Sequence, residues 1–186
     1  MKDKTYQSLD LYKKPKETNF LIKLKKFVWY VFFYPIVKSY IPGTFWRKFI
    51  LKLFGSKIGK RCVTKPNLRV KYPWNLKIGD NCWLGESLWI DNIDEVIIEK
   101  NVCISQGVYL CTGNHNYKKI GFDLFINPIL IKEESWICAK CIVGPGSKIM
   151  KGTVLTSGST FSGNSLEGSI YTGCPATFVR KRNLER

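Results

Sequence analysis

The sequence predicts a β-dominated solenoid preceded by helices, and three observations support this fold class. From Ile58 onward an aliphatic residue returns at every sixth position, as in Ile58-Gly-Lys-Arg-Cys-Val and Ile78-Gly-Asp-Asn-Cys-Trp. The second position of the unit is often glycine, and the fifth is usually small. A repeat this short is typical of a solenoid in which each unit forms one side of a coil. We therefore expect a β-solenoid from Ile58 to about Thr160, followed by a last coil that unwinds into an extended C-terminal tail.

Helices are expected before the repeats. Residues 1–19 are polar and predict a loosely held arm, after which a helix begins at Phe20 and ends near Pro35. A second helix is expected between Thr44, as its N-cap, and Gly55, as its C-terminal stop. We expect its apolar residues to form one buried stripe and its basic residues to lie off that stripe. The stripe comprises Phe45, Trp46, Phe49, Ile50, Leu53 and Phe54; the basic residues are Arg47, Lys48 and Lys52.

These patterns divide the chain into a basic N-terminal segment, residues 1–57, and a repeat domain, residues 58–186. The period stops between Leu110 and Ile131, which predicts an extruded loop over about residues 112–130. A smaller irregularity between Ile93 and Val96 requires one or two inserted residues. Because packing of the coils does not require the long interruption, we expect the functional site there.

The chain has seven cysteines, and those at repeat positions are expected to be reduced packing residues. Cys62, Cys82 and Cys141 occupy the fifth position of their units, where a small apolar side chain fits inside a narrow coil. Cys138 and Cys141 have zinc-like spacing, but the chain has no second such pair and a single histidine. We therefore expect no metal.

Positive charge is concentrated near the N-terminus. Residues 1–57 contain 13 Lys/Arg and 3 Asp/Glu, a net charge of +10. Two roles for residues 20–54 remain open: a cap over the end of the solenoid, or a basic amphipathic surface that contacts the membrane. The first 19 residues lack a secretory pattern, and the longest apolar run is too short to span a bilayer. A cytoplasmic location is expected, with peripheral membrane contact as an addition.

Several motifs together resemble the bacterial hexapeptide-repeat acetyltransferases, especially the sugar O-acetyltransferases of exopolysaccharide gene clusters. They are the hexapeptides, Thr112-Gly-Asn-His-Asn, Trp136-Ile-Cys-Ala-Lys-Cys-Ile-Val-Gly-Pro-Gly and Gly173-Cys-Pro-Ala-Thr-Phe-Val-Arg. The resemblance covers about residues 56–181. It implies a left-handed parallel β-helix and transfer of acetyl from acetyl-CoA to a sugar hydroxyl. It also implies a homotrimer with active sites between subunits.

His115 is the expected general base. Acetyl transfer to a hydroxyl needs a group that accepts a proton near neutral pH, and His115 is the only histidine. It lies where the period stops, and it matches the motif of the family. The resemblance places the saccharide acceptor near Asp91, Asn92, Glu86 and Asn114, although Asp91 and Asn92 also suit an ordinary turn.

The resemblance implies that coenzyme A lies along the later coils. Its contacts would involve small residues beside the pantetheine and basic residues beside the phosphates. The former are Ala139, Gly144, Ser157, Gly158, Ser162 and Thr177; the latter are Arg180, Lys181 and Arg182. Trp136 matches a tryptophan of the family, but Trp83 and Trp89 share its position in the unit. One outward aromatic stripe would explain all three equally well.

Three other functions compete with O-acetylation. N-acetylation of an amino sugar stays open, since the same base and donor would serve. A non-catalytic scaffold would need neither the histidine loop nor the Gly-Cys-Pro ending. Nucleic-acid binding is suggested by charge alone, without a recognition motif, so no nucleic-acid partner is expected.

Overall fold

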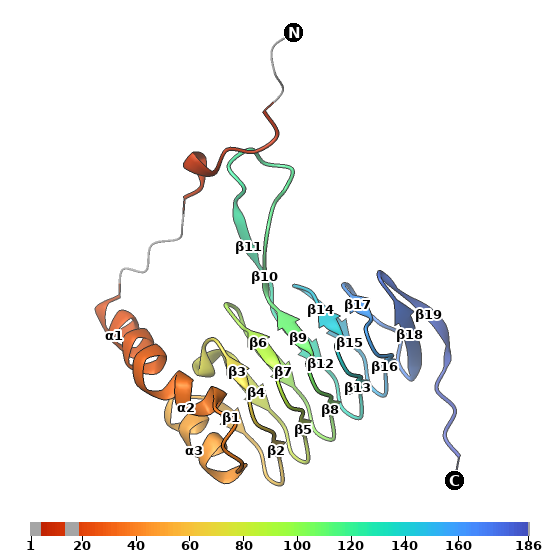
Figure 1. Cartoon of the computed structure of the whole chain (residues 1–186). Coiled ribbons are helices and arrows are strands. Elements are labelled where there is room, and N and C mark those ends of the chain that lie inside the picture. Colours follow the sequence, from red (N-terminus) through yellow and green to blue (C-terminus); the bar gives the residue numbers. More distant parts are fainter. Residues whose placement is uncertain (1–4, 14–18, 186) are drawn as a thin grey trace.

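The computed structural model describes residues 5–13 and 19–185, and its main body is a parallel β-solenoid (Figure 1). Five coils are complete in this part of the chain, and each coil adds one strand to each of three sheets. The predicted fold class is therefore confirmed.

The three sheets are lettered in the order in which the chain enters them. Sheet A contains β1 (Lys57–Ile58), β4 (Leu76–Ile78), β7 (Val96–Ile98), β12 (Ile129–Ile131) and β15 (Lys148–Ile149). Sheet B contains β2 (Val63–Thr64), β5 (Trp83–Leu84), β8 (Cys103–Ile104), β13 (Trp136–Ile137), β16 (Val154–Leu155), β18 (Ser169–Gly173) and β19 (Ala176–Lys181). Sheet C contains β3 (Arg69–Val70), β6 (Trp89–Asp91), β9 (Tyr109–Cys111), β14 (Ile142–Val143) and β17 (Thr160–Phe161).

The core is a column of aliphatic side chains inside the coils. In each strand the aliphatic residue of the repeat points inward. Its side chain stacks on the corresponding side chain of the next coil, as Ile78 does on Ile98. Cys62, Cys82 and Cys141 are buried in this column, as their positions in the repeat predicted. Burial raises the pKa of the Cys82 thiol to about 11, so it behaves as an apolar packing residue.

Glycine at the second position of the unit permits adjacent coils to approach closely. A Cβ atom added to Gly85 would lie 2.5 Å from the carbonyl carbon of Ser105 in the next coil. Real Cβ atoms do not approach backbone this closely, so a larger residue would force the coils apart.

Variation in coil length is confined to the corner between sheets C and A. Steps from sheet A to B and from B to C are six residues long throughout the five coils, as the stacked registers show. The step from sheet C to A is eight residues in the first two coils. It lengthens to 21 residues between Leu110 and Ile131, and returns to six between Val143 and Ile149. The predicted insertion between Ile93 and Val96 is one of these longer corners.

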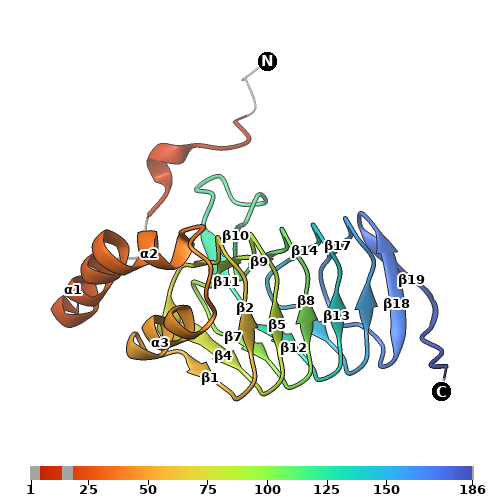
Figure 2. The same cartoon turned by 60° about the horizontal axis from the view of Figure 1, so that its bottom comes forward.

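A helix of 19 residues packs beside the first coil (Figure 2). It comprises α1 (Phe20–Val28), the π-helical segment η2 (Trp29–Phe33) and α2 (Tyr34–Lys38). The expected end near Pro35 is therefore wrong. The wider turn at η2 lets Tyr34 N–H bond to the Trp29 carbonyl, five residues back, so the backbone changes its pairing just before the residue that lacks an N–H.

The second helix, α3 (Phe45–Leu53), has the expected limits but not the expected orientation. Arg47 and Leu51 are fully buried, whereas Phe45, Phe49 and Leu53 are exposed. The predicted buried stripe is therefore confirmed for Phe54, holds in part for the half-buried Trp46 and Ile50, and is wrong for the other three residues. The reason is that the Arg47 guanidinium faces inward and donates to carbonyl oxygens at and beyond the end of the 19-residue helix: those of Val37, Ser39, Ile41 and Gly43.

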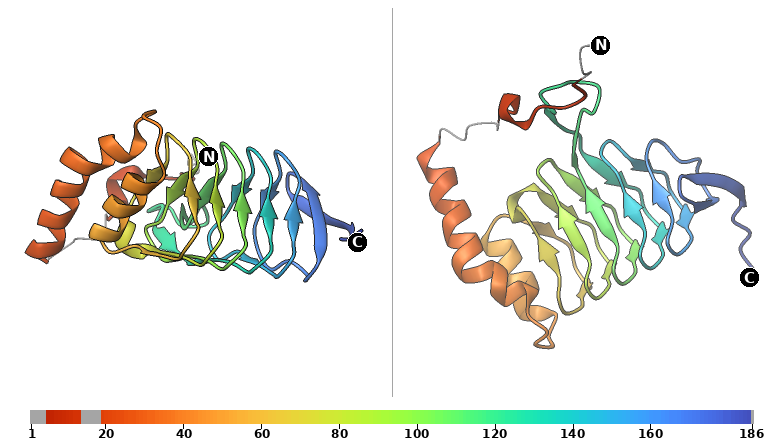
Figure 3. Two further views of the ribbon diagram at one scale, coloured as in Figure 1. Left: turned by 90° about the horizontal axis from the view of Figure 1, so that it is seen from below. Right: turned by 45° about the horizontal axis from the view of Figure 1, so that its top comes forward.

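Contacts of both helices cover the first coil, which supports the predicted cap. Trp29 is buried against Phe54 and donates its indole N–H to the Val70 carbonyl, 3.2 Å away. At the opposite end of the solenoid, β18 pairs with the antiparallel strand β19, which turns the chain back on itself. Figure 3 shows the helices and this hairpin at the two ends of the coils.

Candidate functional site

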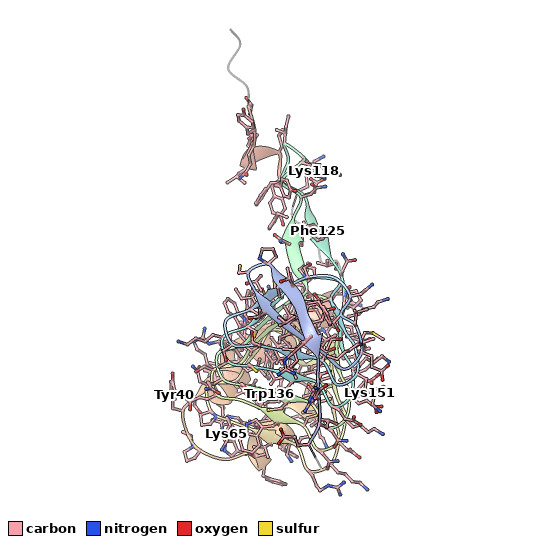
Figure 4. The ribbon with its side chains drawn as sticks, turned by 90° about the vertical axis from the view of Figure 1, so that its right-hand side faces the viewer. Tyr40, Lys65, Lys118, Phe125, Trp136 and Lys151 are labelled. Carbon is pink, nitrogen blue, oxygen red and sulfur yellow. The ribbon has the colours of Figure 1, made fainter. Side chains whose placement is uncertain are left out.

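The long corner between sheets C and A forms an antiparallel hairpin that projects from the solenoid. Its strands are β10 (Gly113–His115) and β11 (Leu124–Ile126), and His115 pairs with Leu124. Figure 4 shows Lys118 and Phe125 on this projection and Trp136 and Lys151 on the coils. We call residues 113–126 the histidine hairpin.

The His115 imidazole is held by one residue of the hairpin, Phe122. Its Nδ1 atom lies 2.7 Å from the Phe122 carbonyl oxygen, and the two rings stack with centroids 4.3 Å apart. A carbonyl oxygen only accepts, so in the neutral ring Nδ1 is the protonated nitrogen and Nε2 retains the lone pair. The imidazole is thus oriented to accept a proton at Nε2.

The N-terminal arm also contacts this hairpin. Ser8 N–H donates to the Ile120 carbonyl oxygen at 2.9 Å, and the Tyr12 ring packs edge-on against His115 with centroids 5.3 Å apart. The expected loose arm is therefore wrong for residues 5–13, which contain the short 3-10 turn η1 (Leu9–Leu11). The same expectation for residues 1–4 and 14–18 lies outside the described residues. Nothing in the sequence links Tyr12 with His115, because the contact spans about 100 residues.

Asp91 lines a small hollow between the long helix and sheet C. The hollow has a volume of about 140 Å³ and is lined by Tyr30, Tyr34, Lys71, Trp89 and Asp91. The Asp91 carboxylate forms an ion pair of 2.7 Å with Lys71 and accepts a hydrogen bond of 3.3 Å from the Tyr109 hydroxyl. Burial raises the pKa of both Tyr30 and Tyr109, so these phenols keep their protons.

Asp91 and the histidine hairpin are neighbours. Asp91 at the end of β6 pairs with Cys111 at the end of β9, and the hairpin begins two residues later. Aromatic faces and paired charges with free hydrogen-bonding capacity suit a sugar ring, which presents both C–H and O–H groups. The structure thus brings two of the predicted residues, Asp91 and His115, to the same corner of the solenoid.

The other predicted acceptor residues lie in different settings. Asn92 is fully buried, and its amide bonds Tyr72 and Asn75 in the adjoining corner. Asn114 accepts from the His115 backbone N–H at 2.8 Å within the hairpin. Glu86 is exposed at the opposite corner, between sheets B and C.

Five of the predicted coenzyme A residues lie at the two corners on either side of sheet C. Ala139 and Gly158 are joined by a backbone hydrogen bond of 2.9 Å at the corner between sheets B and C, where Ser157 also lies. Gly144 and Ser162 are neighbours at the corner between sheets C and A. Gly158 is exposed, and a Cβ atom built on it meets no atom within 4 Å.

Three further predicted cofactor residues lie on the last strand, β19, and Arg182 directly follows it. Thr177, Arg180 and Lys181 are exposed on β19, while Arg182 donates to the Glu134 and Gly152 carbonyl oxygens. Lys181 donates to the Glu167 carbonyl oxygen at 2.7 Å. Arg180 donates to the Lys181 carbonyl oxygen at 3.2 Å. The side chains of Lys181 and Arg182 are thus held by hydrogen bonds to backbone carbonyl oxygens of neighbouring turns.

The three tryptophans do not form one stripe. Trp83 and Trp136 lie on sheet B, separated by Cys103, whereas Trp89 lies on sheet C and stacks on Tyr109. The expectation of one stripe is therefore wrong, because the sixth position of successive units falls on successive faces. Trp136 donates its indole N–H to the Ser105 hydroxyl at 3.0 Å.

A larger hollow of about 430 Å³ lies over sheet A, away from His115, and is lined by lysines, Glu99 and Glu133. Within residues 5–13 and 19–185, no three His, Cys, Asp or Glu side chains gather in a way that could hold a metal ion. All seven cysteines are free thiols.

Comparison with known proteins identifies a close relative and several similar folds. The chain is 37% identical over 137 residues to WcaF of Escherichia coli, which is named as an acetyltransferase of colanic acid biosynthesis. The match covers 74% of this chain and 75% of that protein. No family model matches the chain.

Solved structures of low identity share the fold. A maltose O-acetyltransferase from Clostridium difficile superposes with a TM-score of 0.80 and 19% identity, covering 89% of this chain and 90% of that one. A hexapeptide-repeat acetyltransferase from Vibrio cholerae, in complex with acetyl coenzyme A, has a TM-score of 0.79 and 16% identity, with 92% and 94% covered. The fold is thus the expected left-handed parallel β-helix.

Proposed function

Because the chain belongs to the hexapeptide-repeat acetyltransferases, we propose that it transfers the acetyl group of acetyl-CoA to a saccharide hydroxyl, with His115 as general base. The observation that supports this assignment most directly is the contact between His115 Nδ1 and the Phe122 carbonyl oxygen, which leaves Nε2 able to accept a proton. The histidine lies on a projection between the coils predicted for the acceptor and those predicted for the donor.

In the proposed reaction, the acceptor hydroxyl oxygen attacks the thioester carbonyl carbon as His115 Nε2 removes the hydroxyl proton. The new C–O bond forms, and the C–S bond breaks. The proton then passes from Nε2 to the departing sulfur, which gives the acetyl ester and free coenzyme A. The Phe122 carbonyl stabilises the imidazolium that exists between these two proton transfers, since it accepts from Nδ1 in either state.

The acceptor is proposed to bind beside Asp91. The hollow at Asp91 provides aromatic walls from Trp89 and Tyr34, and a carboxylate that can accept from sugar hydroxyls. Its position next to the histidine hairpin supports a saccharide longer than one sugar, with one ring in the hollow and the reacting hydroxyl near His115. A precursor of an exopolysaccharide or O-antigen, free or lipid-linked, fits this description.

We propose that the enzyme acts in the cytoplasm as a homotrimer in which a neighbouring subunit completes each site. Exposed apolar side chains on sheet B and on the histidine hairpin support such an assembly, among them Trp83, Trp136 and Phe125. Light scattering coupled to gel filtration would measure the mass directly; a monomer at micromolar concentration would contradict the shared site.

The function is tested by measuring the release of free coenzyme A from acetyl-CoA in the presence of each member of a panel of mono- and oligosaccharides. The proposal expects thiol release that depends on one class of saccharide, and a product whose acetyl group is lost in mild base. A base-stable acetamide would instead assign the chain to the N-acetylation of an amino sugar. Absence of saccharide-dependent release over the whole panel, with lipid-linked acceptors included, would contradict both.

A further inference from the structure

The N-terminal helices expose an apolar surface that no other described part of the chain covers. It consists of seven apolar side chains, each at least 46% exposed to solvent, and the Phe45 side chain is 80% exposed. We define the apolar surface as Phe20, Leu24, Phe27 and Val31 on the long helix with Phe45, Phe49 and Leu53 on α3.

Each set forms one face of its helix, opposite the residues that pack on the solenoid. The members recur at intervals of three or four residues, which places them on one side of a helix. Phe20 and Phe27 lie about 160–180° around the axis from buried Trp29, at about 100° per residue. On α3, Phe49 lies about 160° from buried Leu51 by the same count. Both apolar faces thus point away from the coils.

The surrounding charge has a single sign. No acidic residue occurs between Glu17 and Asp80. Lys23, Lys38 and Lys52 are exposed on the helices, so cations border the apolar surface. Other lysines are bound within the fold, such as Lys25, which lies 4.6 Å from the centroid of the Trp74 ring.

We infer that the apolar surface docks on a lipid membrane that contains anionic headgroups. An apolar helix face bordered by lysines inserts its side chains between the acyl chains and places its cations at the lipid phosphates. Charge distinguishes this partner from a second copy of the chain, since two copies would bring two basic segments together. No helix in the described ranges is long and apolar enough to cross a bilayer, so the contact is with one leaflet.

The same helix links the membrane to the proposed acceptor site. Tyr30 and Tyr34, on its inner side, line the hollow that contains Asp91. A docked helix therefore holds this hollow close to the headgroups, where the saccharide of a lipid-linked precursor would lie. This consequence for the acceptor rests on the proposed function, whereas docking itself does not.

Flotation of the full chain with lipid vesicles, without acetyl-CoA, tests the inference. We expect flotation with phosphatidylcholine and phosphatidylglycerol in equal parts, less with phosphatidylcholine alone, and release in high salt. The variant Phe20→Ser/Leu24→Ser/Phe27→Ser is expected to stay at the bottom of the gradient. Leu166→Ser/Leu184→Ser is the matched control: it replaces exposed apolar residues at the far end of the chain and is expected to float like the parent.

Lysine variants test the charge separately. Lys23→Gln and Lys52→Gln are each expected to weaken binding about fivefold, since a basic residue near an anionic surface contributes about 1 kcal/mol. Lys148→Gln, an exposed lysine on β15, is the control and is expected to bind unchanged. Thermal melts identify any variant that fails to fold.

Three results would overturn the inference. They are no flotation of the parent protein, equal flotation of the triple variant, and a change of oligomeric mass in the triple variant, which would make the surface an interface between copies. A protein that floats but transfers no acetyl group contradicts the proposed function alone. A protein that acetylates free saccharides but does not float contradicts docking alone.

Discussion

The Nδ1 atom of His115 lies 2.7 Å from the carbonyl oxygen of Phe122, and the rings of the two residues are stacked within 3° of parallel. Both contacts come from one residue of the same hairpin, and the Tyr12 ring of the N-terminal arm adds a third contact with the imidazole. The backbone of Phe122 determines which nitrogen holds the proton, and its side chain determines the plane of the ring.

Replacement of the base should abolish most of the activity without unfolding the protein. His115→Ala is expected to lower kcat by about 10²–10⁴-fold, the usual contribution of a positioned general base. His115 is half-buried on a projecting hairpin, so the melting temperature should change little. Steady-state kinetics and thermal melts measure the two effects. Lys118→Ala, in the exposed tip of the same hairpin, is the control; activity retained by His115→Ala would remove this residue from the mechanism.

Loss of the stacked ring should reduce the rate without loss of the hydrogen bond. Phe122→Ala keeps the carbonyl oxygen but frees the plane of the imidazole, so kcat should fall about two- to tenfold. The KM for acetyl-CoA should stay the same, and the pH–rate profile should keep its shape because the base is still present. Phe45→Ala removes an exposed ring from α3, away from the hairpin, and serves as the control with a soluble acceptor. A raised KM with unchanged kcat would contradict the positioning role.

Asp91 should act on the acceptor and not on the donor. Asp91→Asn keeps the shape of the side chain but removes its charge, so the KM for the saccharide should rise about tenfold or more. The KM for acetyl-CoA should be unaffected. Glu95→Gln removes a carboxylate that pairs with Lys77 on sheet A, and it provides a matched control. Equal effects of the two variants would point to a general loss of charge.

The buried guanidinium of Arg47 should be important for stability. Arg47→Ala removes the guanidinium donor from the carbonyl oxygens of Val37 and Ile41 and creates a cavity, so the free energy of unfolding should fall by about 3 kcal/mol or more. Urea denaturation monitored by circular dichroism gives this value. The exposed Lys52→Ala on the same helix should change the free energy of unfolding by less than about 0.5 kcal/mol.

Thiol reactivity should separate the packing cysteines from the exposed one. Burial raises the pKa of Cys82 and of Cys138 to about 11, so at pH 8 only about one thiol in a thousand is the reactive thiolate. Iodoacetamide at pH 8 should therefore label exposed Cys174 in the native protein and reach Cys82 only after unfolding. Peptide mass spectrometry quantifies the labelling. Equal labelling of Cys82 and Cys174 in the native state would contradict the packing role.

The sequence predicted the coils well because their residues obey a local rule. The aliphatic residue of each unit points inward whatever the rest of the chain does, so Ile78 and Ile137 could be assigned to the core from the period alone. Which face of each helix is buried was harder to predict. Apolar content predicted that Phe45 and Phe49 would be buried, but the carbonyl oxygens at and beyond the end of the first helix required Arg47 on the inner side instead.

In the candidate site, too, one residue could be predicted from a local pattern, whereas its contacts could not. The interrupted period identified His115, since packing alone would not place a histidine there. Its supporting contacts depend on how distant segments fold: Tyr12 reaches it from the N-terminal arm, and Tyr30 reaches the Asp91 hollow from the long helix. No local pattern encodes such contacts, and a single sequence does not reveal them.

The confinement of length changes to the corner between sheets C and A has a consequence for how this scaffold can be altered. Deletion of one residue within a six-residue step would shift the next strand by one position and turn its inward side chain toward solvent. At that corner the chain already accepts eight, 21 or six residues while the coils on both sides keep their register. New loops can therefore be grafted there with little cost to folding. Substrate choice in this architecture can diverge at one edge while the rest of the scaffold is left unchanged.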